Sequence, residues 1–131
     1  MIYETKINYE SEGKVVKEQY IIENAELFGE VEGKLYEEFG NFPNFGVLSI
    51  KTNNKIREVI NQREDEEDFI WTAELQDVFH TDEGDEKHIR YKVIIFAKTF
   101  DSAKTKIVKY IQQGYDMTLI SLKLTDFKEV L

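Results

Sequence analysis

Hydrophobic and polar residues alternate with a period of two at the start of the chain. In residues 2–9 (IYETKINY), one side of this alternation is formed by Tyr3, Thr5, Ile7 and Tyr9. Such a pattern is typical of a half-buried β-strand. Residues 10–13 (ESEG) predict a turn, in which Gly13 can adopt a positive φ angle. Residues 14–22 (KVVKEQYII) then predict the returning strand of a hairpin.

A helical spacing of apolar residues follows the hairpin. Asn24 occupies the position of an N-cap before a predicted helix over residues 25–39. The apolar face of this helix is formed by Phe28, Val31, Leu35 and Phe39. Gly40 favours the end of the helix. We expect a third strand over residues 45–52 and a short extension, either helix or strand, over residues 55–60.

The second half of the chain repeats this order of elements. The expected elements are a strand over 69–79, a polar loop over 80–88, a strand over 89–97, a helix over 103–113, a strand over 117–124 and an extension over 127–131. Asp101 or Ser102 can cap the helix, and Gly114 can end it. Apolar positions of the two helices recur 72 residues apart, as in Leu35 and Ile107.

The two halves therefore predict an internal duplication. Their first strands correspond at a spacing of 68 residues, as in Tyr3 and Trp71. We assign an α+β fold made of two ββαβ units, residues 1–60 and 69–131, joined by an acidic linker, residues 61–68. Each unit should hold an antiparallel or mixed three-stranded sheet with a crossover helix, and its third strand should lie antiparallel to its first. The sheets are either separate or merged into one, and a pseudo-twofold axis relates the units.

Composition narrows the class of protein. The hydrophobic share of 41% and the aromatic share of 13% are those of a packed globular protein. A unit of about sixty residues buries too little apolar surface to be safely stable alone, so we expect one domain containing both units. The absence of cysteine excludes disulfides and thiolate metal sites. No signal-peptide pattern opens the chain, and no apolar run approaches the roughly 20 residues needed to span a membrane.

Charge provides the first candidate contacts. The formal net charge of −9 argues against direct binding of nucleic acid, which requires clustered Lys and Arg. The exposed face of the first helix is acidic and that of the second is basic: Glu26, Glu32 and Glu37 correspond to Lys98, Lys104 and Lys109. These faces either meet protein partners, including neighbouring copies, or reflect drift at solvated positions, where single charges contribute little.

Three further segments carry candidate chemistry. His80 and His88 flank the acidic loop TDEGDE and can in principle ligate a transition metal, although their spacing matches no established motif. Arg63 is followed by five acidic residues, which form either a docking or cation site or, as we favour, a solvated linker kept open by self-repulsion. Phe42 and Phe45 in the loop GNFPNFG either close the end of the core, which we favour, or project as a protein contact.

No arrangement of residues indicates catalysis. The dense acidic clusters fall in predicted loops or on the solvent side of the first helix, whereas acid–base catalysis needs a concave, desolvated setting. The segment FGEVEG (residues 28–33) is predicted to be helical rather than a phosphate-binding glycine loop. We therefore expect no enzymatic activity, no cofactor and no metal.

The chain resembles a known family over essentially its whole length. The segments that carry the resemblance are IYETKINYE, KEQYIIENA and VLSIKTNNKIREVI in the first half and FIWTAEL and VIIFAKTFDSAKTKI in the second. They are similar to an uncharacterised family of small proteins from Bacteroidetes and the phages infecting them, including crAss-like phages. The sequence departs from the family pattern at Gln19, where the pattern has proline, and in its more acidic linker. The resemblance implies a phage or gut-bacterial origin and assigns no catalytic residues.

These observations favour a non-enzymatic protein-interaction or assembly module. We expect a phage-encoded structural or accessory protein of the virion or the bacterial host cytoplasm, whose partners are copies of itself or other virion or host proteins. One alternative is an acidic inhibitor that mimics phosphates toward a host nucleic-acid-binding enzyme. The other is a protein that binds a small ligand or a metal.

Overall fold

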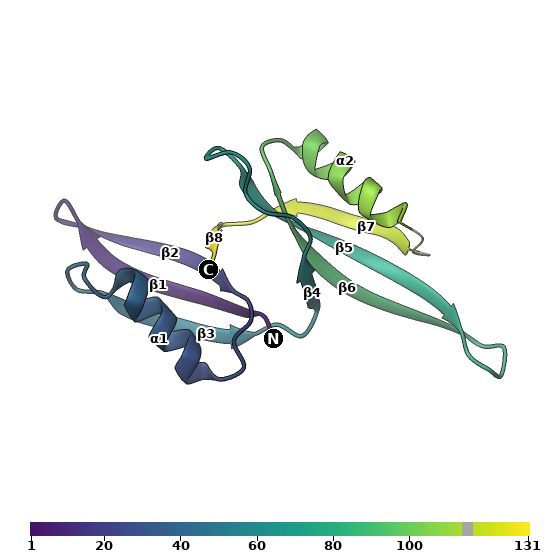
Figure 1. Ribbon diagram of the computed structural model, residues 1–131, viewed down its shortest axis with the longest axis horizontal. Helices are drawn as coiled ribbons and strands as arrows, with labels where there is room; N and C mark the ends of the chain where they lie inside the picture. The colour runs from purple at the N-terminus through teal and green to yellow at the C-terminus, as the bar shows by residue number, and fades with distance from the viewer. Residues whose placement is uncertain (114–116) are drawn as a thin grey trace. The chain divides into compact units, whose positions relative to one another are not determined.

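The computed structural model describes residues 1–113 and 117–131 and has an α+β fold (Figure 1). Its elements are β1 (Tyr3–Ser11), β2 (Lys14–Ile22), α1 (Phe28–Phe39), β3 (Gly46–Thr52), β4 (Ile56–Val59), β5 (Phe69–His80), β6 (Glu86–Ala97), α2 (Phe100–Ile111), β7 (Met117–Leu124) and β8 (Phe127–Val130). The chain forms two compact units. Unit 1 consists of Met1–Asn54 and Asp126–Leu131, and unit 2 of Lys55–Thr125. Each unit contains one four-stranded mixed sheet and one helix.

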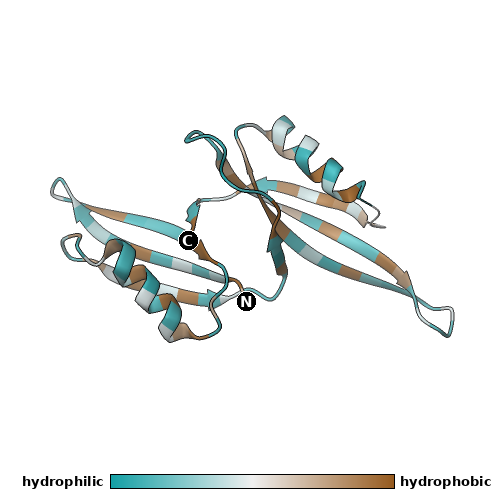
Figure 2. Ribbon diagram, in the orientation of Figure 1, coloured by the Kyte–Doolittle hydropathy of each residue, from teal (hydrophilic) through white to brown (hydrophobic). Residues whose placement is uncertain are grey.

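The sheet of unit 1 has the strand order β3-β1-β2-β8. As predicted, β1 pairs antiparallel with both β2 and β3, whereas β8 adds in parallel to β2. Tyr3 and Ile7 of β1 form the core of unit 1 with Ile22 of β2 and with Val31 and Leu35 of α1. The alternation that predicted the strands is visible in Figure 2 and leaves one side of each strand facing the helix.

The sheet of unit 2 has the equivalent order β4-β6-β5-β7. Here too the first two long strands pair antiparallel, the strand after the helix joins the outer side of β5, and a short strand adds in parallel to β6. Ala103 and Ile107 of α2 pack in the core of unit 2 with Trp71, Leu75 and Val93. The separate sheets exclude the merged sheet considered from the sequence.

The fourth strand of each sheet changes the predicted division of the chain. We expected residues 55–60 and 127–131 to extend their own halves, which gave three-stranded sheets. In the structure β4 joins the sheet of unit 2, and β8 joins the sheet of unit 1. Each repeat therefore supplies a strand to the unit formed mainly by the other repeat. The two segments carry the same apolar pattern, so the sequence contains no signal for which sheet each one joins.

The hairpin of unit 2 is longer than predicted. We assigned residues 80–88 to a loop, but β5 continues to His80 and β6 begins at Glu86, with Val78 opposite His88 in the ladder. The connecting loop is therefore limited to residues 81–85. Val78 and its aromatic and β-branched neighbours favour extended backbone, which lets the ladder continue past the polar residues.

Both helices begin at different residues from those predicted. Asn24 has a φ angle of 64°, so it forms a left-handed turn after β2 rather than an N-cap, and Leu27 occupies the N-cap of α1 without a side-chain hydrogen bond. In α2 the N-cap is Thr99, whose hydroxyl accepts a hydrogen bond from the backbone N–H of Ser102 at 3.1 Å. The predicted stop at Gly114 lies outside the described residues.

Equivalent contacts in the two units support the duplication. The Tyr3 hydroxyl donates to the carbonyl of Glu26 at 3.0 Å, and the Trp71 indole N–H donates to the carbonyl of Ala97 at 2.8 Å. Both aromatic rings also meet a phenylalanine edge-on at the start of the helix. Tyr3 and Trp71, which correspond at a spacing of 68, thus contact Phe28 and Phe100, which correspond at a spacing of 72.

The edge strands β3 and β7 share one further irregularity. Each contains a β-bulge with an extra residue, Leu48 in β3 and Ile120 in β7, and these residues lie 72 positions apart. Bulges interrupt the regular row of backbone groups that an edge strand presents. Both long edges are therefore poor templates for uncontrolled pairing with other chains.

Candidate interaction surfaces

The oppositely charged residues predicted as contacts are all exposed. They are Glu26, Glu32 and Glu37 in unit 1 and Lys98, Lys104 and Lys109 in unit 2. Glu26 and Lys98 precede their helices, so only the other four lie on α1 and α2. The Lys98 ammonium lies 3.1 Å from the carboxylate of Glu67 and 3.3 Å from that of Asp65. Lys98 is therefore already engaged within unit 2.

The acidic segment of residues 61–68 is an ordered loop between β4 and β5 and does not connect the two units. The Asp68 carboxylate is buried and accepts the backbone N–H groups of Glu64 and Asp65 at 3.0 and 3.1 Å. The Asp65 carboxylate accepts the N–H of Glu67 at 2.9 Å. These bonds fold the loop, so self-repulsion does not hold it open. The segment was predicted as a linker because local carboxylate-to-amide bonds cannot be read from a run of acids.

The same loop shifts the pKa values of its charged groups. The N–H of Glu67 and the ammonium of Lys98 hold the pKa of Asp65 below its ordinary value. The carboxylates of Glu67 and Asp65 raise the pKa of Lys98. The carboxylates of Asp65, Glu67 and Asp68 therefore bond within unit 2, although only Asp68 among them is buried.

The loop between α1 and β3 closes one end of the core of unit 1. Phe45 is partly buried and packs against the core, and its ring centroid lies 4.9 Å from that of Tyr36. Phe42 remains 44% exposed and lies on Tyr9, with 4.7 Å between ring centroids. The backbone N–H of Glu10 donates to the carbonyl of Pro43 at 2.8 Å and fixes the loop to β1. Phe42 is thus at the rim of the aromatic cluster and Phe45 is inside it.

The two histidines lie on the long hairpin of unit 2. His80 ends β5, and His88 in β6 lies opposite Val78. The Nδ1 atom of His88 is 2.8 Å from the amide nitrogen of Gln76, and its Nε2 atom is 3.6 Å from the carboxylate of Glu86. Among residues 1–113 and 117–131, no group of three or more His, Asp or Glu side chains is arranged to hold a metal ion.

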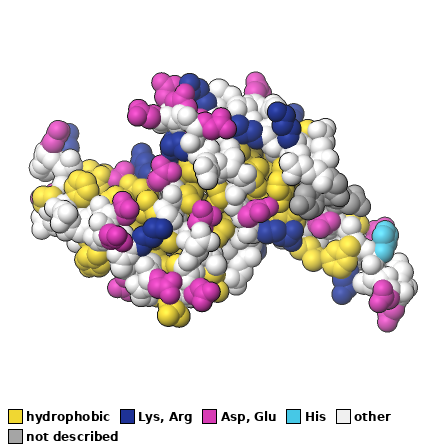
Figure 3. Space-filling model, viewed as in Figure 1, with side chains coloured by type: hydrophobic (Ala, Val, Ile, Leu, Met, Phe, Trp, Pro, Cys, Tyr) yellow, Lys and Arg dark blue, Asp and Glu magenta, His cyan; other side chains and the backbone are white. Residues whose placement is uncertain are grey.

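Sequence reasoning missed the amphipathic character of this hairpin. Beyond the ladder with β7, residues 78–89 form a two-stranded ribbon that we call the arm. One face of the arm carries Phe79 and Ile89, which are 39% and 42% exposed. Hydrophobic atoms are visible on this hairpin in Figure 3. Phe79 and Ile89 stood at the ends of the two predicted strands, but the predicted loop between them hid that they lie on one face of a continuous ladder.

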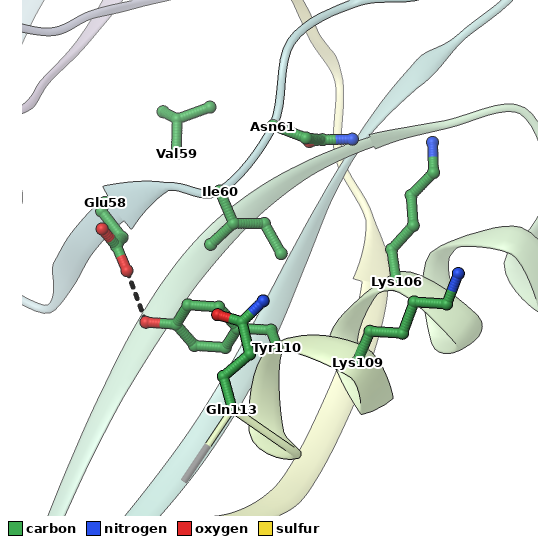
Figure 4. Close-up of a pocket in the computed structure, with 8 residues that line it drawn as sticks. All are labelled: Glu58, Val59, Ile60, Asn61, Lys106, Lys109, Tyr110 and Gln113. Atoms are coloured by element: carbon green, nitrogen blue, oxygen red, sulfur yellow. Dashed lines mark hydrogen bonds between the residues drawn. The ribbon is translucent and has the colours of Figure 1, made fainter. Parts of the chain in front are cut away.

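A shallow hollow of about 410 Å³ lies between β4 and α2 in unit 2 (Figure 4). Its lining consists of Glu58, Val59, Ile60, Asn61, Lys106, Lys109, Tyr110 and Gln113. The Tyr110 hydroxyl donates to the Glu58 carboxylate, and the Lys106 ammonium donates to the carbonyl of Phe96 at 2.8 Å. The Asn61 side chain also bonds to the backbone of Phe96. These polar groups thus hold β4 and α2 against β6.

The fold is that of a small α+β protein built from two equivalent four-stranded units. The chain belongs to the family described as Domain of unknown function (DUF4494), whose match covers residues 1–131. The predicted full-length resemblance to an uncharacterised family is confirmed, whereas the phage or gut-bacterial origin stays a prediction. No curated protein and no solved structure matches the chain. In the described ranges, neither helix combines the length and the apolar character needed to cross a membrane.

Proposed function

We propose that the protein is a non-enzymatic protein-interaction or assembly module. In finer terms, it is a phage-encoded structural or accessory protein that associates with the virion. The resemblance to small proteins of Bacteroidetes and their phages supports this origin. The partner is a second copy of the chain or another virion or host protein.

The arm is the observation that carries the proposal. Phe79 and Ile89 lie on the face of the hairpin that, closer to the core, carries Leu75 and Tyr91 and packs against α2. Within the arm these two side chains remain well exposed. Burying each of them against a partner would contribute about 1 kcal/mol through the area removed from water. An exposed apolar pair on a projecting ribbon therefore favours protein contact.

The opposite face of the hairpin carries bonded polar side chains at the base of the arm. The Gln76 side-chain nitrogen contacts the His88 ring, and the Arg90 guanidinium donates to the side-chain oxygen of Gln76 at 3.2 Å. These bonds support the base of a two-stranded ribbon, which is only marginally stable by itself. A ribbon supported at its base presents the apolar pair to a partner in a preformed arrangement, and preformed contacts lose less entropy on binding.

The test compares two hairpins in the full chain. In the arm variant, Phe79→Ser and Ile89→Thr remove the apolar pair; in the control, Val15→Thr changes a side chain that is 63% exposed in the β1–β2 hairpin. Light scattering during size-exclusion chromatography measures self-association, and pull-down with purified phage particles or host lysate measures binding to other proteins.

We expect the wild-type chain and the control to associate and the arm variant to lose association while keeping its circular dichroism spectrum. A wild-type chain that stays monomeric at high concentration and binds no virion or host protein would contradict the function. Association that survives in the arm variant would show that another surface carries it.

A further inference from the structure

The open side of β2 in unit 1 is a receptor for an extended segment, and its occupant is β8. In the parallel ladder, Gln19 lies opposite Phe127 and Ile21 lies opposite Val130. The N–H of Leu131 donates to the carbonyl of Ile21 at 2.7 Å, and the Leu131 side chain packs against the core of unit 1. The site thus combines backbone pairing with a place for one apolar side chain.

Unit 2 shows the same mode of recognition. β4 adds in parallel to β6, the N–H of Ile60 donates to the carbonyl of Ile94 at 3.0 Å, and Ile60 packs against the core. In both cases the pairing is interrupted by a bulge at the second residue of the short strand, Arg57 or Lys128. Two independent occupants therefore define one pattern, an apolar residue, a basic residue, Glu, Val and a final apolar residue.

The two occupants are tied to their sheets differently. β4 is followed in the chain by the rest of its own unit, because residues 55–125 form unit 2 without interruption. β8 reaches unit 1 only after the chain has completed unit 2. A four-residue edge strand with an interrupted ladder belongs to the part of a structure that opens at low free-energy cost.

We propose that β8 is exchanged between molecules, so that β8 of one copy occupies the β2 edge of unit 1 in another copy. This inference rests on the proposed assembly function: contacts through the arm bring copies together, and exchange of β8 then links them. Exchange of an identical element reproduces every contact of the closed form and so needs no new interface. Because closure within one chain has an effective concentration of about millimolar, exchange is expected at comparable protein concentrations or within an ordered assembly.

The chain contains no cysteine, so an engineered disulfide can report this exchange without interference. A full-length Gln19→Cys chain is mixed with a full-length Phe127→Cys chain at about 1 mM, near the effective concentration of closure, in a thiol–disulfide buffer. Each variant is first checked by circular dichroism for the wild-type fold. The covalent mixed dimer is measured by non-reducing gel electrophoresis and mass spectrometry.

Two matched controls make the result specific. Lys17→Cys places the thiol on the same strand and the same face as Gln19 but out of register with Phe127. A chain carrying both Gln19→Cys and Phe127→Cys should close within one molecule. Since disulfides require Cα atoms within about 7 Å, we expect the Gln19–Phe127 mixed dimer to exceed the Lys17–Phe127 product by about tenfold.

Equal yields from the two mixtures, with the doubly substituted chain closing internally, would overturn the exchange. Failure of the doubly substituted chain to close would overturn the ladder on which it rests. Association of the wild-type chain without the mixed disulfide would leave the assembly function standing and remove only this mechanism.

Discussion

Unit 1 and unit 2 have the same strand order, but the chain builds them in different ways. Unit 2 is one continuous stretch, whereas unit 1 combines residues 1–54 with residues 126–131. The contacts that both units keep, such as the aromatic hydrogen bond to the segment before the helix and the bulged edge strand, are those that the fold requires. Contacts present in only one unit are not required by the fold and therefore indicate candidate functional surfaces of that unit.

Each unit has such contacts of its own. Unit 1 ends in an aromatic cluster around Phe39, in which the Glu18 carboxylate raises the pKa of Tyr9 and burial raises the pKa of Tyr20. Unit 2 has the arm, the folded acidic loop and the Arg57 guanidinium 3.5 Å from the centre of the Tyr91 ring. The comparison teaches that unit 2 carries most of the features expected of a contact surface.

The largest expected effect tests the shared part of the comparison. Leu35 and Ile107 occupy equivalent, fully buried positions, so Leu35→Ala and Ile107→Ala should each lower the free energy of unfolding by about 3 kcal/mol. Urea denaturation followed by circular dichroism measures this loss. Exposed Val108→Ala in α2 is the control and should cost much less.

The single tryptophan sharpens the same experiment. Trp71 lies in the core of unit 2, so its fluorescence reports on that unit while circular dichroism reports on both. Because a unit of this size is only marginally stable alone, we expect the two signals to change together, also in Leu35→Ala. A Leu35→Ala chain whose fluorescence transition stays in place would show that the units unfold independently.

The helix caps provide the next largest effect. Thr99→Ala removes the side-chain cap of α2 and should destabilise the protein by about 1 kcal/mol, whereas Thr99→Ser should retain most of the cap. Leu27→Ser introduces a cap where α1 has none and should stabilise the protein by up to about 1 kcal/mol. Thermal unfolding measures both changes. Equal midpoints for Thr99→Ala and Thr99→Ser would refute the assigned cap.

A smaller effect tests a contact specific to unit 2. Arg57→Met keeps much of the apolar stem but removes the charge above the Tyr91 ring, and should cost about 0.5–1 kcal/mol. Arg57→Lys keeps a cation and should cost less. The loss is measured by urea denaturation followed by Trp71 fluorescence. If the two variants prove equally stable, the ring contact contributes no electrostatic stabilisation.

The smallest effect is pH-dependent and concerns the acidic loop. The pKa of Asp65 is lower in the folded protein than in the unfolded chain, so its stabilisation is present above about pH 4, the ordinary range of an Asp, and is lost as the pH falls through the lowered pKa. Lys98→Met should move the pKa of Asp65 back toward its ordinary value. Carboxyl NMR titration measures both values, and an unchanged Asp65 titration in the variant would contradict the role of Lys98.

The sequence predicted the parts of the fold that follow from local periodicity. The hairpins, both helices and the antiparallel placement of the third strands were predicted because their apolar spacing depends on neighbouring residues. The sheets that β4 and β8 join were not predicted, because the segments that begin at Ile56 and Phe127 have the same apolar pattern. Pairing partners distant in sequence leave no periodic signal within either segment.

The sequence predicted some of the candidate contacts but not those that depend on residues distant in the chain. Exposed charges such as Lys104 and Lys109 follow from their place on an amphipathic helix. The engagement of Lys98, the folding of the acidic loop and the exposed face of the arm depend on hairpin register and on carboxylate-to-amide geometry. Neither can be deduced from the order of charges along the chain.

The late arrival of β8 has a consequence for synthesis on the ribosome. Unit 2 can close its sheet as soon as residue 125 has left the exit tunnel, although residues 1–54 of unit 1 were translated earlier. Residues 1–54 must wait with one flank of β2 unoccupied until residues 126–131 have also left the tunnel. During that interval the unoccupied edge of β2 can pair with β8 of another copy made from the same messenger RNA.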